Sequence, residues 1–499
     1  MAIVTVNEIT YKVVRGAGLG KLLADAAVMN MPCGGHGRCG KCKVTVRGAV
    51  SELSHSEKQL LTEEEIRRGI RLACCVKVEG DCVVSLATAG DGQIKISGDM
   101  PKIQMKPGFQ TYGFVLDIGT TTLAARLYDV RGTLLAEGSC LNPQSSWGAD
   151  VISRIEAAID GADKVIAEVI CAAVDDLLSQ LSASAGISPA EIDGMVVTGN
   201  TVMLHLLTRT STEPLSHAPF AAERLFGETV SAGELGITKL SPEAGVYLAP
   251  CASAFVGADL ITALLASGIC ENDSTQLLTD IGTNGEMALW HRGKLTCCST
   301  AAGPAFEGAG ISMGMGGSAG AIDKVIVQNG ALTAHVIGGG LPRGICGSGI
   351  VDATACLLEI CLLDETGYME EDSVMILPPV SLSRKDIRMV QLAKAAIHAG
   401  IRTLLSSAGL DCGEVSRLVI AGGFGSYLDA KNAGKIELLP AEMVSRIHVA
   451  GNAALSGAAM LLLNQDSRAS CEGYAKQAKV LELSSDPVFS EEYMERMMF

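Results

Sequence analysis

One short phrase occurs twice in this chain and constrains its fold more than any other feature. Residues 114–121 read Phe-Val-Leu-Asp-Ile-Gly-Thr-Thr, and residues 277–283 read Leu-Leu-Thr-Asp-Ile-Gly-Thr. Each copy has the pattern of a buried strand, a tight turn and a second strand. Backbone N–H groups and threonine hydroxyls in such a turn can face phosphate oxygens, while Asp117 or Asp280 holds a metal ion or its waters. Two matched copies predict a two-lobed molecule that binds a nucleotide between its halves.

A third glycine turn lies near the end of the chain. The buried strand predicted at 418–421 runs into Gly422-Gly423. Because glycine has no side chain, a planar ring can lie directly against the backbone there. The helix-period segment at 452–463 carries small residues on one side and is expected to pack closely behind this turn.

The first hundred residues contain a tight group of cysteines. Cys33, Cys39 and Cys42 lie in one glycine-rich loop, and a fourth thiol follows at Cys74 or Cys75. Three thiolates in a loop plus a distant fourth is the plant-type [2Fe–2S] arrangement, whose usual spacing is C-x4-C-x2-C. The first gap here is one residue longer, which the extra glycine can absorb.

Zinc is the competing interpretation of these cysteines, since four thiolates also suit a tetrahedral zinc site. Zinc ribbons usually pair two C-x-x-C knuckles, however, and this part of the chain has one. Spacing alone does not decide between Cys74 and Cys75. His36 is interpreted as a loop residue, because centres with histidine ligands use two.

Composition excludes several classes of protein. The chain has 499 residues, 39 basic against 55 acidic side chains, and a formal charge of −16, which argues against nucleic acid as a primary partner. Neither an export signal nor a long apolar run is evident, so we expect a cytoplasmic protein without a membrane segment. In a reducing cytosol most of the 17 cysteines are expected to be core residues.

The motifs resemble a known superfamily. Two Asp-Ile-Gly-Thr turns followed by a strand–Gly-Gly turn, in this order, are similar to the actin/sugar-kinase/Hsp70 ATPases. With the cysteine-rich front, the whole chain resembles the ATP-dependent reductive activators of corrinoid proteins. The phrases at 142–155, 198–206 and 451–458 are similar to that family's.

The resemblance implies an architecture. A β-grasp, ferredoxin-like α+β domain is expected at 1–88 and a linker at 89–110. A two-lobed α/β ATPase of the RNase H-like type is expected at 111–499, with lobes at about 111–275 and 276–499. The cofactors implied are a [2Fe–2S] cluster, ATP and Mg²⁺.

The resemblance also implies an activity and its residues. The protein would return an inactive Co(II) corrinoid to Co(I) in a methyltransferase system, using ATP and an electron that passes through the cluster. Its partners would be a corrinoid protein and an upstream low-potential electron donor, with a homodimer expected and no nucleic acid or membrane partner. By resemblance to the Leu-Ala-Cys phrase of such domains, Cys74 is chosen as the fourth ligand. The implied roles are magnesium and water positioning by Asp117 and Asp280, phosphate contacts from Gly119, Thr120, Thr121, Gly282, Thr283 and Asn284, adenosine contacts from Gly422 and Gly423, and cluster ligation by Cys33, Cys39, Cys42 and Cys74.

Three rival interpretations remain open on the sequence. A small-molecule kinase of the same superfamily could carry a redox-sensing iron–sulfur domain, and it would phosphorylate a free metabolite. An activator of 2-hydroxyacyl-CoA dehydratases also joins such an ATPase to a cluster, but without a ferredoxin-like front domain. A plain electron carrier would use the ATPase half only as a binding platform.

Overall fold

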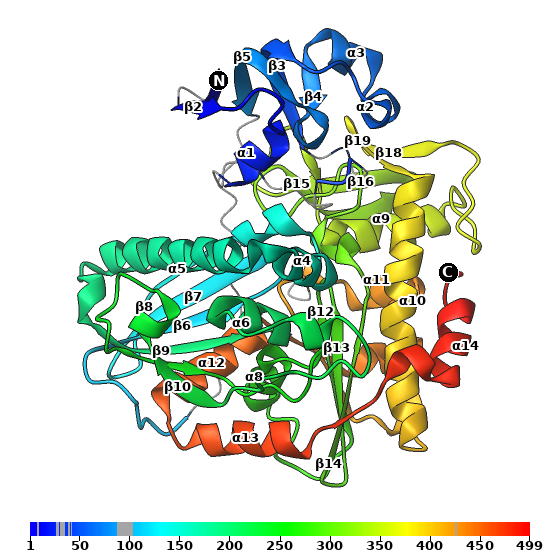
Figure 1. The fold of residues 1–499 in the computed structure, drawn as a ribbon. Helices are drawn as coiled ribbons and strands as arrows, with labels where there is room; N and C mark the ends of the chain where they lie inside the picture. Colours follow the sequence, from blue (N-terminus) through cyan, green and yellow to red (C-terminus); the bar gives the residue numbers. More distant parts are fainter. Residues whose placement is uncertain are drawn as a thin grey trace. The chain divides into compact units, whose positions relative to one another are not determined.

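The chain forms two compact units in the computed structural model (Figure 1). The structure describes residues 1–6, 9–25, 29, 35–37, 40, 42–86, 103–424 and 427–499. Described residues within 1–91 and 142–173 form the front unit, and those within 92–141 and 174–499 form the large unit. Each unit is described here by itself.

The front unit is built on a five-stranded sheet of order β2-β1-β5-β3-β4. β1 and β2 form the predicted hairpin, and β1 also pairs with β5 in parallel. This mixed sheet confirms the ferredoxin-like expectation. Its strands are β1 Ala2–Val6, β2 Ile9–Val13, β3 Lys43–Val50, β4 Ile70–Leu72 and β5 Val78–Leu86.

The segment at 54–68, acidic at its start and basic at its end, forms two short helices. Ser54 and Glu57 close a capping box on the first helix, which ends because Leu61 is extended (φ −106°, ψ 141°). Thr62 and Glu65 then exchange the same pair of backbone–side-chain hydrogen bonds at the second start. Two capping boxes in succession therefore divide the segment.

The large unit contains two six-stranded sheets in which five strands follow the same order, while the sixth strand lies at opposite edges. Their orders are β10-β11-β9-β6-β7-β8 and β21-β20-β12-β13-β14-β22. In each sheet the strand that ends in Asp-Ile pairs antiparallel with the next strand and parallel with a later one. The repeated phrase is therefore a repeated structural unit, as predicted, and the two-lobed α/β fold is confirmed.

The strands of the large unit are as follows. The first sheet has β6 Tyr112–Ile118, β7 Thr122–Asp129, β8 Leu134–Leu141, β9 Ile192–Gly199, β10 Glu228–Ser231 and β11 Gly245–Leu248. The second has β12 Gln276–Ile281, β13 Gly285–His291, β14 Lys294–Thr300, β20 Arg417–Ala421, β21 Ile447–Gly451 and β22 Lys479–Val480. Two small sheets add β15 Ala321–Gln328, β16 Ala331–Val336, β17 Gly344–Ile345, β18 Ser373–Leu377 and β19 Val380–Ser383.

Fourteen α-helices are found in the described residues. Their bounds are α1 Leu19–Asp25, α2 His55–Leu60, α3 Glu63–Arg67, α4 Val151–Ala157, α5 Asp163–Ala185, α6 Thr201–Thr208, α7 Ala232–Leu235, α8 Ala258–Ser267, α9 Gly347–Glu359, α10 Arg384–Ser407, α11 Ala430–Lys435, α12 Ala453–Leu463, α13 Ser467–Gln477 and α14 Pro487–Glu495. Figure 1 shows α14 beside the long helix α10. Within the described chain, no helix combines the length and apolarity needed to cross a membrane.

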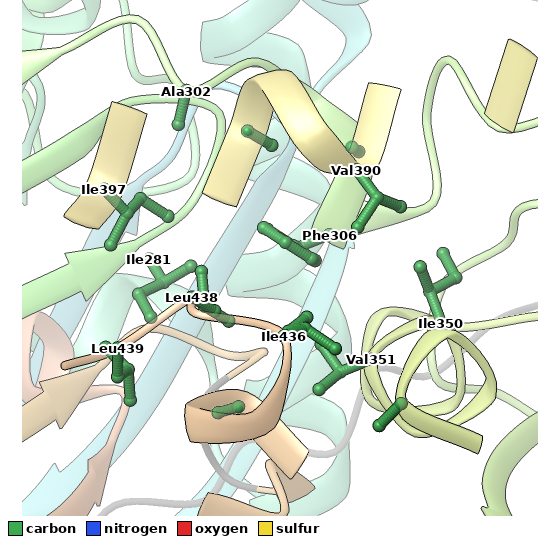
Figure 2. Close-up of a cluster of buried hydrophobic side chains, with 14 of the residues drawn as sticks. Ile281, Ala302, Phe306, Ile350, Val351, Val390, Ile397, Ile436, Leu438 and Leu439 are labelled. Carbon is green, nitrogen blue, oxygen red and sulfur yellow. The ribbon is translucent and has the colours of Figure 1, made fainter. Parts of the chain in front are cut away.

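A continuous apolar core lies behind the second sheet of the large unit. Figure 2 shows part of it, with side chains from β12, from the segment after β14, and from α9 and α10 pointing toward one another. Phe306 is 2% exposed within this cluster. The core thus fixes the positions of the turns and helix starts that face the site.

Helix α12 is buried along its whole length. It packs against α8, where a side chain on Gly457 would overlap the carbonyl of Thr262, so only glycine allows this approach. At its C-terminal end, Leu463 O accepts a hydrogen bond from Lys106 N at 2.9 Å and Leu462 O accepts one from Gly108 N at 3.3 Å. Helix α12 therefore runs from the site, at Asn452, to the segment at 106–108.

Candidate functional site

The two Asp-Ile-Gly-Thr turns face each other across one cavity of about 290 Å³ in the large unit. The hydroxyl oxygens of Thr121 and Thr283 lie 3.4 Å apart. The cavity is lined by all ten residues predicted for the nucleotide site: Asp117, Gly119, Thr120, Thr121, Asp280, Gly282, Thr283, Asn284, Gly422 and Gly423. The structure thus brings together segments that are far apart in the sequence.

Asp117 ends β6 and is fully buried. Burial raises the pKa of its carboxyl group to about 7, although the Asn452 side chain opposes the shift. Asn452 Nδ2 donates a hydrogen bond to Asp117 Oδ2 at 2.9 Å, and Asn452 also caps α12 through Leu455 N. A helix-capping residue therefore favours the charged form of Asp117, against the larger effect of burial.

Asp280 occupies the equivalent place at the end of β12. Burial raises its pKa to about 8, and the charges of Asp259, Asp117 and Glu307 add to the shift. Among the described residues no amide donor corresponds to Asn452 on this side. A carboxylate that faces other carboxylates without a donor is suited to a bound cation.

Two further acids line the same cavity and were not predicted from the sequence. Asp259, in the first turn of α8, and Glu286, at the start of β13, both line the cavity. Burial raises the pKa of Asp259, and burial together with Asp259 raises the pKa of Glu286 well above its ordinary range. Asn200 Nδ2 donates to Glu286 Oε1 at 3.0 Å. Glu286 comes two residues after Asn284, and this spacing is a signal that could have found it.

Glu307 is a third unpredicted acid, and it contacts both turns. The Thr121 hydroxyl donates to Glu307 Oε2 at 2.7 Å, and the Thr283 hydroxyl donates to the same oxygen at 2.5 Å. The residue ends a short 3₁₀ helix, Pro304–Glu307, inside a glycine-dense stretch of the sequence. One carboxylate thus holds the hydroxyls of both predicted phosphate turns.

The Gly422-Gly423 turn forms another wall of the cavity. Gly422 has φ +93°, and a side chain there would lie 2.6 Å from Asp280 Oδ1. Phe424 follows and stacks on Phe306 with ring centroids 5.1 Å apart. The start of α9, at Gly347, also lines the cavity, so a further glycine-rich turn belongs to the same site.

The predicted cluster ligands are only partly within the described residues. Cys33 and Cys39 lie outside them. Cys42 Sγ and Cys74 Sγ are 3.2 Å apart, and Cys75 Sγ is 3.7 Å from Cys74 Sγ. The hydrogen bond from Cys42 and burial raise the pKa of the Cys74 thiol, and burial raises that of Cys75 to about 11.

Buried hydrogen bonds of Glu57 hold the segment that leads to Cys74. Glu57 is fully buried and accepts hydrogen bonds from Arg71 Nε at 2.8 Å and from Leu72 N at 3.1 Å. Burial would raise the pKa of Glu57, but these bonds outweigh it and hold the pKa below its ordinary range. Thiols held this close match the needs of a group that binds several thiolates at once. Among the described residues, however, no three Cys, His, Asp or Glu side chains form a ready-made metal site.

Several residues of types that often bind metal ions lie in the interior of the protein. His205 is fully buried, its Nδ1 lies 2.9 Å from the Thr201 carbonyl, and burial lowers its pKa. Cys82, Cys297 and Cys298 are also buried.

Three family profiles match the chain. Residues 4–79 match the 2Fe-2S iron-sulfur cluster binding domain, residues 112–272 the RACo middle region, and residues 274–499 the C-terminal domain of RACo, described as the ASKHA domain. ASKHA denotes the actin, sugar-kinase and Hsp70 superfamily of ATPases, so the fold and the iron–sulfur and ATP-binding character of the two parts agree with the sequence expectation.

Individual proteins give a consistent result. The corrinoid activation enzyme RamQ of Eubacterium limosum is 36% identical over 419 residues, covering 78% of this chain and 70% of RamQ. The [Co(II) methylated amine-specific corrinoid protein] reductase of Methanosarcina barkeri is 25% identical over 384 residues, covering 71% and 70%. A solved structure of a reductive activator for corrinoid, iron-sulfur protein is 27% identical, with a TM-score of 0.74, over 100% of this chain and 98% of that one.

Proposed function

The chain belongs to the RACo family of corrinoid activation enzymes, and on that premise we propose that it reduces a corrinoid protein from inactive Co(II) to Co(I) at the expense of ATP. The observation that carries the proposal is the pair of threonine hydroxyls, Thr121 and Thr283, that face one cavity in a chain with an N-terminal 2Fe-2S domain. A nucleotide site and an electron-carrying site are thereby joined in one polypeptide.

The nucleotide phosphates would lie between the two turns. The hydroxyls of Thr120, Thr121 and Thr283 supply donors, and Asn284 adds an amide. Gly119 and Gly282 shape the turns, because their N–H groups donate to Thr122 O and Asn284 O within them. Gly422 and Gly423 leave room for the adenosine against the backbone.

Mg²⁺ is part of the proposed site because the cavity is lined by acidic side chains. Asp117, Asp259, Asp280, Glu286 and Glu307 line the cavity, whereas its described lining has no Lys or Arg. A triphosphate beside five carboxyl groups requires a cation between them. Mg²⁺ is usually held by one or two carboxylates together with substrate phosphates, and Asp280 and Asp117 are placed to supply them.

In the front unit, Cys33, Cys39, Cys42 and Cys74 would hold the [2Fe–2S] cluster. The short Cys42–Cys74 separation supports Cys74 over Cys75 as the fourth ligand. When bound, such a cluster supplies one electron at a time at a potential near about −400 mV. Returning a corrinoid to Co(I) requires a still more reducing electron, so the reaction needs help from the nucleotide.

ATP would act on the corrinoid equilibrium rather than on the cluster. A coupling free energy of about 3 kcal/mol between two sites is typical and corresponds to about 130 mV for one electron. The ATPase lobes would favour a conformation of the bound corrinoid protein in which cobalt loses an axial ligand and accepts the electron more readily. Asp117, Asp280 and the two threonines would couple nucleotide state to that conformation.

The proposal also includes domain boundaries, partners, location and oligomeric state. The domains are 1–88, a linker at 89–110, and an ATPase at 111–499 with lobes at about 111–275 and 276–499. The partners are a corrinoid protein of a methyltransferase system and an upstream low-potential electron donor. We place the protein in the cytoplasm as a homodimer that acts without nucleic acid or membrane.

Anaerobic iron and sulfide analysis, with a visible spectrum, tests the cluster in the wild type and in Cys39→Ala. Two iron and two sulfide atoms per chain, lost in the variant, are expected. Reduction of a Co(II) corrinoid protein is then followed with and without ATP, and Asp117→Ala should abolish it. Finding zinc, or no metal, would refute the proposed reductase function.

The rival small-molecule kinase makes the opposite prediction. Phosphoryl transfer to a free metabolite would survive loss of the cluster in Cys39→Ala, whereas ATP-dependent corrinoid reduction would not. A plain electron carrier would keep its activity in Asp117→Ala. These two variants therefore separate the three functions.

A further inference from the structure

Glu307 occupies the place that a phosphate would need. Its Oε2 accepts hydrogen bonds from Thr121 at 2.7 Å and Thr283 at 2.5 Å, and a side chain on Gly282 would lie 3.4 Å from its Oε1. Hydroxyl donors and a bare glycine backbone are what a phosphate oxygen requires. The carboxylate uses the donors of both turns at once.

From this geometry we propose that Glu307 is an internal anion that holds the two phosphate turns together and must be displaced when a nucleotide binds. The inference rests on the proposed nucleotide site. A hydroxyl has one proton to donate, so Thr121 and Thr283 cannot each serve Glu307 and a phosphate oxygen together. A negatively charged phosphate and the carboxylate also repel each other in a partly buried site.

The backbone around Glu307 connects its displacement to other walls of the cavity. Gly303 N donates to Thr283 O at 2.9 Å, which fastens the start of the 3₁₀ helix to the second turn. The neighbouring Phe306 is buried in the core shown in Figure 2 and stacks on Phe424, next to the Gly422-Gly423 turn. A side chain on Gly347, at the start of α9, would overlap the Phe306 carbonyl.

These contacts make Glu307 a competitor of the nucleotide phosphate for the two threonine hydroxyls. Its carboxylate changes position when phosphate binds, and Phe306 connects it to the Gly422-Gly423 turn and to α9. The cost of displacing Glu307 lowers the apparent affinity for nucleotide, since the binding-competent arrangement is only part of the apo population. Removing the charge should therefore tighten nucleotide binding.

Calorimetric titration of the whole protein with a non-hydrolysable imido analogue of ATP and Mg²⁺ tests the proposal. Glu307→Gln should bind about tenfold more tightly than the wild type, which corresponds to about 1.4 kcal/mol. Unchanged or weaker binding would overturn the inference, because a magnesium ligand or a merely structural residue gives that result. Glu243→Gln, on the exposed surface, controls for net charge and should bind like the wild type.

A thermal measurement separates competition from loss of structure. Without nucleotide Glu307→Gln should melt below the wild type, because the bond between the turns is weakened, yet its gain in Tm at a fixed analogue concentration should be larger. A lower Tm with an unchanged gain would contradict competition. Should Glu307→Gln not fold, Glu307→Asp, which retains the charge but not the reach to both hydroxyls, should show the same larger gain.

Different results would contradict the proposed nucleotide site and the proposed role of Glu307. If the wild type does not bind the analogue at all, the nucleotide site of the proposed function is wrong. If the wild type binds it and neither Glu307 variant binds more tightly, the nucleotide site stands and only the role of Glu307 is wrong.

Discussion

The two Asp-Ile-Gly-Thr turns are nearly identical in sequence and wiring, but they differ in what surrounds their acids. Asp117 accepts a hydrogen bond from Asn452, whereas Asp280 faces Asp259, Asp117 and Glu307. Gly422, with a positive φ, packs against Asp280, while the equivalent Gly199 packs against the backbone of Ile118. A shared motif therefore specifies the shape of a turn, and the neighbours supplied by other segments specify its electrostatics. We therefore expect Asp280 to contribute more than Asp117 to the binding of a cation.

Neutralising each acid in turn should give the largest effect. Asp280→Asn should lower the ATPase rate by about 10² to 10³-fold, because a group that stabilises developing charge is lost. Asp117→Asn should lower it by only about tenfold, since the new amide can still pair with Asn452. Steady-state ATP hydrolysis at saturating Mg²⁺ measures both. Equal losses would show that the two acids contribute equally to hydrolysis. A larger loss at Asp117 would show that the expected order is reversed.

Removing Asn452 should make the first turn resemble the second. Asn452→Ala should reduce ATP hydrolysis by about five- to tenfold and shift the acid limb of its pH profile upward, because Asp117 loses the donor that opposes its raised pKa. Asn452→Ser is the matched control for the helix cap, because serine caps a helix but is too short to reach Asp117. An upward shift that is equally large in Asn452→Ser would assign the effect to the cap.

The stability of the apo protein should fall as pH rises from about 5 to 7. Burial raises the pKa values of Asp117 and Asp280 from the ordinary 3.8 to about 7 and about 8. In this window the folded state keeps protons that the unfolded chain has released, so the free energy of unfolding decreases by up to about 1.4 kcal/mol per pH unit for each group. Thermal unfolding at several pH values measures the slope, and Asp280→Asn should flatten it more than Asp117→Asn. A Tm that rises between pH 5 and 7 would contradict the raised pKa values.

The smallest effect is expected where the turns differ only in side-chain shape. Asn284→Thr gives the second turn the residue type of Thr121, and the Asn284 carbonyl that accepts from Gly282 N is unaffected. Nucleotide affinity should change by less than about threefold, within the range of one exposed hydrogen bond. A change above tenfold, measured by titration, would mean that the Asn284 amide contributes more to nucleotide binding than one exposed hydrogen bond.

The sequence predicts the parts of the site that lie within single turns. Asp117 and Asp280 lie one residue before the ends of buried strands, and Gly422 directly follows one. Parallel pairing of β6 with β9 and of β12 with β20 brings such strand ends together. Cys42 and Cys74 lie close together in the same way, because β3 and β4 are neighbouring strands. Local pattern plus sheet topology was sufficient for these residues.

The remaining site residues depend on packing that no local pattern encodes. Asn452 was visible only as the start of a helix, and its bond to Asp117 follows from how α12 lies against the first sheet. Glu307 follows a proline in a glycine-dense stretch, and its reach to two threonines depends on the burial of Phe306 beside it.

Helix α12 has a mechanical consequence. An eleven-residue helix is about 16 Å long and stiff. One end is capped by Asn452, which contacts Asp117, and the other is hydrogen-bonded to Lys106. The route from the first Asp-Ile-Gly-Thr turn to Lys106 therefore consists of one amide, one stiff helix and one backbone hydrogen bond. A shift of α12 at the cavity would therefore displace the segment at 106–108, at the far end of the same helix.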